Sequence, residues 1–186
     1  NGDDYPNAIA LNDANQLFIA GAYTANANFS GTILTNSGGY DAFLVRYDLD
    51  VINNTANLGF AKRLFGPSDQ EITSLATRGG EVFGCGVYNS SMTAGSTTIT
   101  ASSYTAFHGK FDTDGNPLWF KVATGAASEI VNDICVENAL HLRPDQMDRV
   151  VQLGLRHESL AHRADGREFV GALLSPFAGS LIPVIG

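Results

Sequence analysis

Oxygen-bearing side chains stand at alternate positions in one short segment, Asp112, Asp114 and Asn116. Calcium loops present their first ligands with this spacing, but they also need a bidentate glutamate further along, and none follows at the required place. The alternative is a hairpin turn, since Asp-Gly between two strands is a common turn signal. The sequence favours the turn, both here and at the equivalent pair Asp48 and Asp50, so no metal or other cofactor is expected.

Aromatic residues recur at equivalent or strand-end places in the chain, where an exposed subset could stack on sugar rings. The candidates for such a glycan surface are Tyr23, Tyr88 and Trp119, with Tyr40 and Tyr104 recurring in the same way. Core packing explains most of these positions. Carbohydrate binding is therefore kept as an alternative function.

The histidines do not form a catalytic or zinc-binding pattern. His108 has no nucleophile beside it, so a packing or surface role is favoured over that of a general base. His157 and His162 are five residues apart and lack a third ligand at a zinc-binding spacing, and His141 does not complete one. No enzymatic activity is expected.

Charge and cysteine content narrow the possible partners. The net charge is −8 and the isoelectric point is near 4.8, which argues against nucleic acid or an anionic membrane, because phosphate binding needs clustered Lys and Arg. Cys85 and Cys135 could form a disulfide if their strands were neighbours. Two small buried thiols are the favoured interpretation.

The segments that carry these residues repeat along the chain. Ile9, Leu75 and Ile134 stand at equivalent places, at spacings of 75 − 9 = 66 and 134 − 75 = 59 residues. A long period built from short alternating strands is typical of repeat proteins in which no unit buries its core alone. The matching segments are NAIALNDANQLFIAGAYT (7–24) with TSLATRGGEVFGCGVYN (73–89), GGYDAFLVRYDLD (38–50) with SSYTAFHGKFDTD (102–114), and the reopening NDICVEN (132–138).

Each complete unit is expected to contain four antiparallel strands, the layout of a propeller blade. Gly21 and Gly86 lie inside the second strand of their units, which indicates that another backbone approaches closely. Equivalent apolar residues should be buried in matching places. These pairs are Ile9 with Leu75, Phe18 with Phe83, and Phe43 with Phe107.

The ordered residues of the two units resemble a known family, the bacterial β-propeller repeats often labelled SBBP, over about residues 2–138. The matching residues are Gly21, Phe29, Gly31, Leu34, Gly38, Asp41, Phe43, Arg46 and Asp48, then Gly86, Gly95, Phe107, Lys110, Asp112, Gly115 and Trp119. The second unit departs from the pattern at Ala94 and Thr105. The resemblance implies a propeller-type fold and an extracellular or cell-envelope setting. It implies no activity, because the repeat is a scaffold.

The composition changes near Asn138. Residues 1–138 contain 14 Asn and 13 Thr, whereas residues 139–186 contain neither. The expected organisation is a first unit over about 5–67, a second over about 68–127, a partial third over about 128–138, and a non-repeat tail over 139–186 that is not recognised. The tail could also be foreign sequence from a fusion or a shifted reading frame.

A helix followed by an apolar run is expected in the tail. Pro144 suits a first helical turn, and a set of apolar residues follows helical spacing. That set is Met147, Val150, Val151 and Leu155. The uncharged run Phe169–Gly186 is interrupted by Pro176 and Pro183, so burial or a protein interface is favoured over a membrane span.

The sequence therefore predicts an all-β repeat protein that acts as a non-enzymatic structural or interaction module, secreted or on a bacterial cell surface. A signal peptide and an initiator Met are absent at Asn1, so the chain is expected to be a mature or excised fragment. Two units and one opening strand would not close a ring. Self-association or another protein partner is expected to cover the open ends, with a glycan as the alternative ligand.

Overall fold

The computed structural model describes residues 2–123, 125, 128–136, 151–157 and 170–174, and the elements of these residues are all β-strands. The sequence alternates apolar and polar residues along most of them, which is the pattern of half-buried strands. The strands are β1 (Asp4–Leu11), β2 (Gln16–Tyr23), β3 (Ala27–Phe29), β4 (Thr32–Leu34), β5 (Asp41–Asp50), β6 (Thr55–Leu64), β7 (Gln70–Arg78), β8 (Glu81–Tyr88), β9 (Ser91–Ala94), β10 (Thr97–Thr100), β11 (Thr105–Asp112), β12 (Pro117–Val122), β13 (Glu129–Ile134), β14 (Val151–His157) and β15 (Val170–Leu174).

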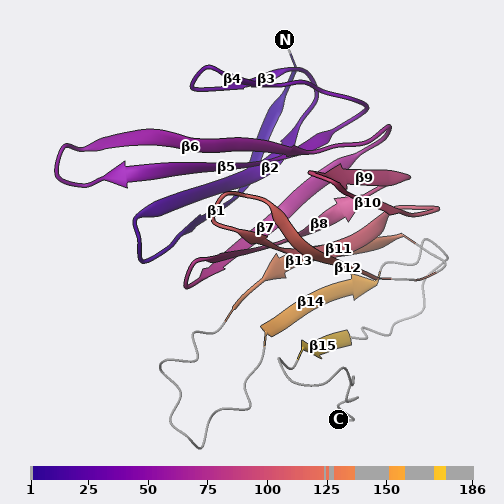
Figure 1. The fold of residues 1–186 in the computed structure, drawn as a ribbon. Coiled ribbons are helices and arrows are strands. Elements are labelled where there is room, and N and C mark those ends of the chain that lie inside the picture. Colours follow the sequence, from indigo (N-terminus) through magenta and orange to yellow (C-terminus); the bar gives the residue numbers. More distant parts are fainter. Residues whose placement is uncertain (1, 124, 126–127, 137–150, 158–169, 175–186) are drawn as a thin grey trace, which may run out of the picture.

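Two four-stranded antiparallel sheets form the body of the protein. The first has the order β1-β2-β5-β6 and the second the order β7-β8-β11-β12, so each sheet follows the chain from one edge to the other. In both, a two-stranded hairpin, β3–β4 or β9–β10, is inserted between the second and third strands. The prediction of four antiparallel strands per unit is confirmed (Figure 1).

The two sheets also match in register. The first strand is irregular between Pro6 and Ala8, between Ile72 and Ser74, and again in β13 after Val131, which gives spacings of 72 − 6 = 66 and 131 − 72 = 59 residues.

The glycines of the second strand fit this irregularity. A Cβ on Gly21 would lie 1.8 Å from the Tyr5 carbonyl oxygen, and one on Gly86 would lie 1.9 Å from that of Glu71. The expected close approach of another backbone is confirmed, because the irregular first strand lies against each glycine.

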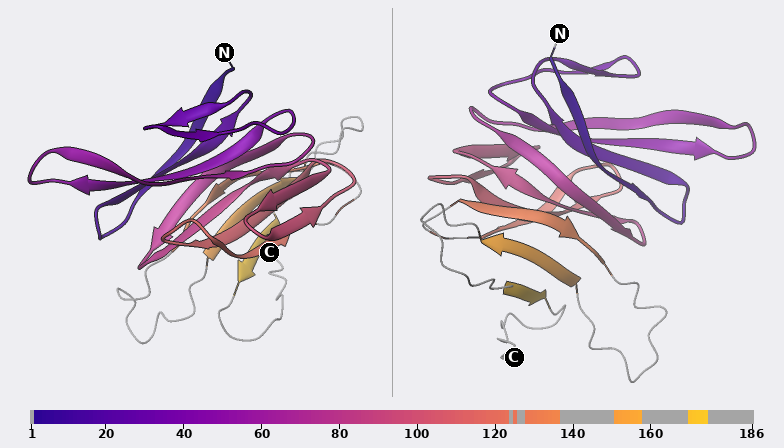
Figure 2. Two further views of the ribbon diagram at one scale, coloured as in Figure 1. Left: turned by 45° about the horizontal axis from the view of Figure 1, so that its top comes forward. Right: turned by 180° about the vertical axis from the view of Figure 1, so that it is seen from behind.

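The sheets are stacked face to face. The front face of each sheet carries the third-strand residues Phe43, Val45 and Tyr47 in the first sheet and Phe107, Gly109 and Phe111 in the second; the back face is the opposite one. The back face of the first sheet packs on the front face of the second, and the back face of the second packs on Val131 and Ile134 of β13. Figures 1 and 2 show the stack, with the β3–β4 hairpin on the outer, front side of the first sheet.

Two of the three predicted residue pairs are buried at matching places, Phe18 with Phe83 and Phe43 with Phe107. The prediction for Ile9 was wrong: its side chain is 66% exposed, whereas that of Leu75 is 8% exposed. Leu75 lies on the front face of the second sheet, which the first sheet covers. Ile9 lies on the front face of the first sheet, and nothing in the described residues covers it there.

The strand β13 pairs with residues from later in the chain. β13, β14 and β15 pair antiparallel in that order, so residues 151–157 form a strand where a helix was expected. Val151, Leu153 and Leu155 also alternate with period two, and Gly154 disfavours a helix. The rest of the expected helix, which was to end at Asp165 and Gly166, lies outside the described residues at 144–150 and 158–164, as does most of the run Phe169–Gly186. No helix long and apolar enough to span a membrane occurs among the residues that the structure describes.

Candidate functional surfaces

The turn from Asp112 to Asn116 closes the β11–β12 hairpin and satisfies its own oxygen atoms. Asp112 Oδ1 accepts the backbone N–H groups of Asp114 and Asn116 at 3.0 and 2.8 Å, and Oδ2 accepts the Asn116 amide at 2.9 Å. Burial raises the pKa of Asp112, but the hydrogen bonds from Asn116 and Asp114 outweigh it and hold the pKa below its ordinary value. Gly115 has φ +74°, which suits glycine. The geometry is that of a turn anchored by its first Asp.

The remaining oxygens of this turn face cations of the first unit. Arg46 Nη1 lies 2.5 Å from the Thr113 carbonyl oxygen and 3.3 Å from Asp114 Oδ1, and Lys62 Nζ donates to Asn116 Oδ1. To coordinate calcium, Asp114, Asn116 and the Thr113 carbonyl would have to lose these contacts with Arg46 and Lys62. Within the described ranges no group of three His, Cys, Asp or Glu side chains is placed to hold a metal ion.

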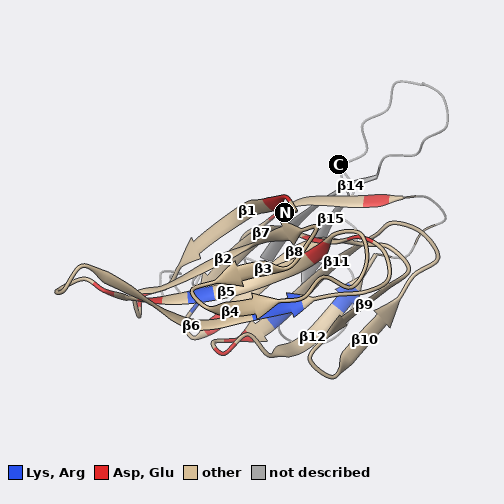
Figure 3. Cartoon of the chain, turned by 90° about the horizontal axis from the view of Figure 1, so that it is seen from above, with Lys and Arg blue, Asp and Glu red and all other residues tan. Residues whose placement is uncertain are grey.

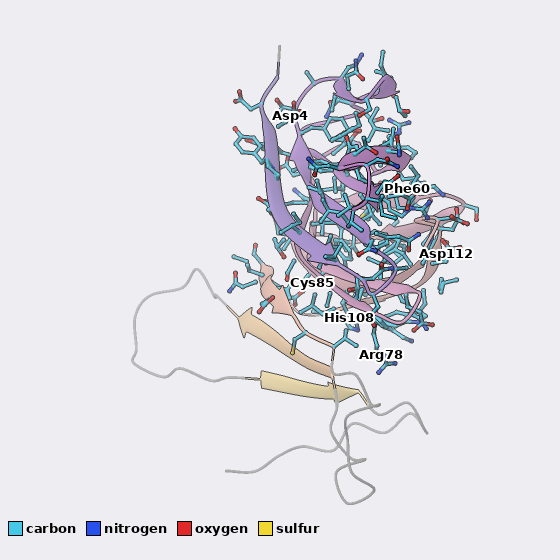
Figure 4. All side chains as sticks on the ribbon, turned by 90° about the vertical axis from the view of Figure 1, so that its left-hand side faces the viewer. Asp4, Phe60, Arg78, Cys85, His108 and Asp112 are labelled. Atoms are coloured by element: carbon cyan, nitrogen blue, oxygen red, sulfur yellow. The ribbon has the colours of Figure 1, made fainter. Side chains whose placement is uncertain are left out.

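The contact of Arg46 and Lys62 with the turn from Asp112 to Asn116 joins the two units, and we call it the latch. Arg46 also binds Asp48 with two nitrogens, at 3.0 and 3.1 Å, which fixes its guanidinium on the back face of the first sheet. The ring of Phe60 lies where a Cβ on Gly115 would stand, at 2.5 Å, so the turn sits directly on that ring. Figure 4 labels Phe60 and Asp112 on the same side of the stack.

The tyrosines named as glycan candidates are not accessible. Tyr23 and Tyr88 are fully buried, and each donates its hydroxyl to a backbone carbonyl, of Thr35 and Thr100 respectively, at 3.2 Å. Desolvation raises the pKa of both. Trp119 is half-buried and packs edge-on against His108, with ring centroids 5.6 Å apart. Tyr23 and Tyr88 therefore follow the core-packing interpretation and present no ring surface to a glycan, because both rings fill the core beneath the inserted hairpins.

Another group of tyrosines is exposed at one end of the stack. Tyr5 and Tyr40 have ring centroids 5.8 Å apart, and the Tyr104 hydroxyl donates to Asp69 Oδ2. The hydrogen bond to Asp69 raises the pKa of Tyr104 to about 12. Asp69 also accepts the backbone N–H of Tyr40. We call this group, with Asp3 bonded to Tyr5, the tyrosine–carboxylate end.

Sequence reasoning named Tyr40 and Tyr104 only as recurrent residues and missed Tyr5, Asp3 and Asp69. The signal was available: Tyr40 and Tyr104 each precede a third strand, and Asp3 and Asp69 each precede a first strand, so the repeat brings all of them to the same end of the sheets.

His108 and Cys85 lie on the back face of the second sheet, paired across neighbouring strands. Desolvation lowers the pKa of His108, with a smaller effect from Lys121. Desolvation raises the pKa of Cys85 to about 11, so its thiol stays protonated at neutral pH. No disulfide joins Cys85 to Cys135. Cys85 is buried as expected, but Cys135 is exposed, contrary to the expectation of two buried thiols.

Asp41 is a buried carboxylate of the first unit with a structural set of partners. It accepts backbone N–H groups of Ser37 at 2.7 Å and Gly66 at 3.3 Å, and Arg63 lies 3.9 Å away. Burial raises its pKa, and these three partners offset part of the effect. The second unit has Thr105 at the equivalent place, so this arrangement belongs to the first unit and joins its inserted hairpin to β6.

The surface charge is scattered. Figure 3 shows basic segments in blue separated from one another among acidic segments in red, with no continuous basic stripe over the part of the chain that is described. A nucleic-acid backbone would need such a stripe. Neither a family model nor a curated protein matches this chain.

Proposed function

We propose that this chain is a non-enzymatic scaffold of stacked β-sheet units, of the SBBP propeller-repeat type, that works in secreted form or at a bacterial cell surface by binding protein units on its exposed faces. The observation that carries the proposal is the repeated face-to-face contact: the back face of one sheet meets the front face of the next in one continuous apolar cluster. A repeat that stacks in this way exposes large surfaces and needs no chemical centre.

The composition supports the same proposal. The net charge of −8 disfavours binding to nucleic acid and to anionic lipid through charge repulsion. A protein partner can bind through apolar surface. The test is sedimentation velocity of the full chain over a range of concentrations. Association that increases with concentration is expected, and a monomer at every concentration would count against the scaffold role.

A second candidate function, glycan binding, is favoured by the tyrosine–carboxylate end. Three part-exposed tyrosine rings beside carboxylates offer stacking surfaces and acceptors for sugar hydroxyls. The test is a glycan array with the full chain, its Tyr40→Ala variant and a matched Tyr40→Phe control. A glycan signal that Phe keeps and Ala loses would favour this function. No signal from the unmodified chain would remove it.

A further inference from the structure

The front face of the first sheet is an apolar surface whose equivalent in the second sheet is fully covered. Ile9 and Leu11 are exposed, and Leu17 and Tyr47 are half-buried. By strand register, the counterparts in the second sheet are Leu75 for Ile9, Val82 for Leu17 and Phe111 for Tyr47. Val82 and Phe111 are both 0% exposed. At these three places the strand pairing is alike and both sheets carry apolar residues. The difference in exposure therefore comes from the neighbour that covers the second sheet and that no described residue provides for the first.

The neighbour of the second sheet has a definite chemistry. Its contacting surface is the back face of the first sheet, which alternates an aromatic or aliphatic side chain with a small one, as in Phe18, Ala20, Ala42 and Leu44. Along β1 and β7 hydrogen bonds close the contact: Thr77 Oγ1 donates to the Leu11 carbonyl at 3.1 Å, and Asn7 Nδ2 donates to Glu71 Oε1 at 2.8 Å. The apolar side chains of this surface fit an apolar sheet face, and Arg46 reaches the hairpin turn of the second unit.

We infer that the front face of the first sheet is a docking surface for a further four-stranded unit of this same repeat, seated through its back face. The inference rests on the proposed scaffold function and names the partner of one of its surfaces. The residues that present the surface, Ile9, Leu11, Leu17, Ile19, Tyr47 and Leu58, carry no charge. A large exposed apolar patch marks an interaction site or a risk of aggregation. The contact between the back face of the first sheet and the front face of the second shows how such a unit would be seated.

The repeat length allows a direct test on the full chain. β1 begins at Asp4 and β7 at Gln70, 70 − 4 = 66 residues later, so a second copy of residues 1–66 placed ahead of Asn1 reproduces the length of the natural connection between units. The reporter is Ile9→Cys in the native unit, in a Cys135→Ser background that removes the exposed thiol. The rate of labelling by a soluble thiol reagent is measured by mass spectrometry at low protein concentration, with and without the added copy.

The expected result is fast labelling of the cysteine at position 9 in the chain of native length and a loss of at least about tenfold in rate in the extended chain, because a buried thiol is shielded from the reagent. Ile52→Cys at the tip of the β5–β6 hairpin, where Ile52 is 90% exposed, is the control and should label equally fast in both chains. Ala20→Asp in the added copy places a carboxylate on the docking face and should restore fast labelling at position 9.

Three results would overturn the inference. Equal labelling rates at position 9 in the two chains would show that no unit docks there. Labelling in the chain of native length that slows as its concentration rises would show that a second copy covers the face instead. Fast labelling of the buried Cys85 would show that β13 does not pack on the back face of the second sheet, and would count against the stacking on which the scaffold proposal rests; a protected Cys85 keeps these two failures apart.

Discussion

Arg46 of the first unit donates to the backbone carbonyl of Thr113 in the second, with 2.5 Å between nitrogen and oxygen. The two residues are 67 positions apart in the chain, and the bond joins the back face of one sheet to the hairpin turn of the next. Asp48 holds the guanidinium by two further contacts. Arg46 therefore ties together strand, turn and neighbouring unit, and its side chain is largely buried in doing so.

Replacement of Arg46 by Ala should lower the free energy of unfolding by about 1.5–3 kcal/mol, the range of hydrogen bonds that involve a charged group. Lys keeps the charge but cannot bind Asp48 with two nitrogens and reach Thr113 as well, so Arg46→Lys should recover only part of the loss. Urea unfolding of the three proteins measures the difference. If Arg46→Lys were as stable as the native chain, the branched guanidinium of Arg46 would not be the source of this stabilisation.

Truncation of either third-strand phenylalanine should be costly to a similar degree in both units. Phe43 packs on Tyr23 and Phe29, and Phe107 on Tyr88 and Phe120, with ring centroids between 5.0 and 6.5 Å apart. Phe43→Ala and Phe107→Ala are each expected to lower the free energy of unfolding by about 3–5 kcal/mol. Chemical denaturation followed by circular dichroism checks this. A loss below about 1 kcal/mol at either site would show that its ring does not support the core.

The strands and most core positions could be predicted because their signals are local. Alternation places Phe43 and Phe107 on one face of their strands, and the Asp-Gly turn marks where β11 ends, without knowledge of any neighbour. Exposure of Ile9 could not be predicted in this way, because Ile9 and Leu75 have the same local pattern and differ only in what packs against them.

The latch and the strand β14 were missed for physical reasons as well. Arg46 and Thr113 come together only through the stacking of two units, so no local pattern relates them. Residues 151–157 satisfy helical and strand spacing at once, and pairing with β13 is a tertiary contact that short-range spacing does not contain. The tyrosine–carboxylate end could have been predicted from the repeat, because Tyr40 and Tyr104 each precede a third strand and Asp3 and Asp69 each precede a first strand.

The Asp112 turn should contribute to stability without calcium. Asp112→Ala removes three hydrogen bonds within the turn, so a loss of about 1–2 kcal/mol is expected. Asp112→Asn keeps one acceptor oxygen for the turn N–H groups and should lose less. Thermal unfolding is measured with calcium chloride and with a chelator. An increase in melting temperature with calcium that Asp112→Ala abolishes would contradict the turn interpretation and favour a metal loop.

Acidification should destabilise the protein through His108. Desolvation holds the pKa of this imidazole in the folded chain below the value of 6.5 that it has when unfolded, with a smaller effect from Lys121. Near neutral pH His108 is uncharged in both states and contributes no pH dependence. As the pH falls below about 6.5, the unfolded chain takes up a proton that the folded chain resists, so the free energy of unfolding decreases.

The matched variant is His108→Phe, which keeps a ring of similar size against Trp119 and cannot titrate. The other titrating groups, including buried Asp41, are common to both proteins and cancel in the comparison. Urea unfolding at a series of pH values from about 7.5 to about 5 should show the native chain losing stability relative to His108→Phe only below about pH 6.5. A constant difference across the series would show that His108 has the same pKa in the folded and unfolded chains. A difference that changes in the opposite direction would show that the folded protein binds the proton more tightly, for which the site would need a carboxylate beside the imidazole.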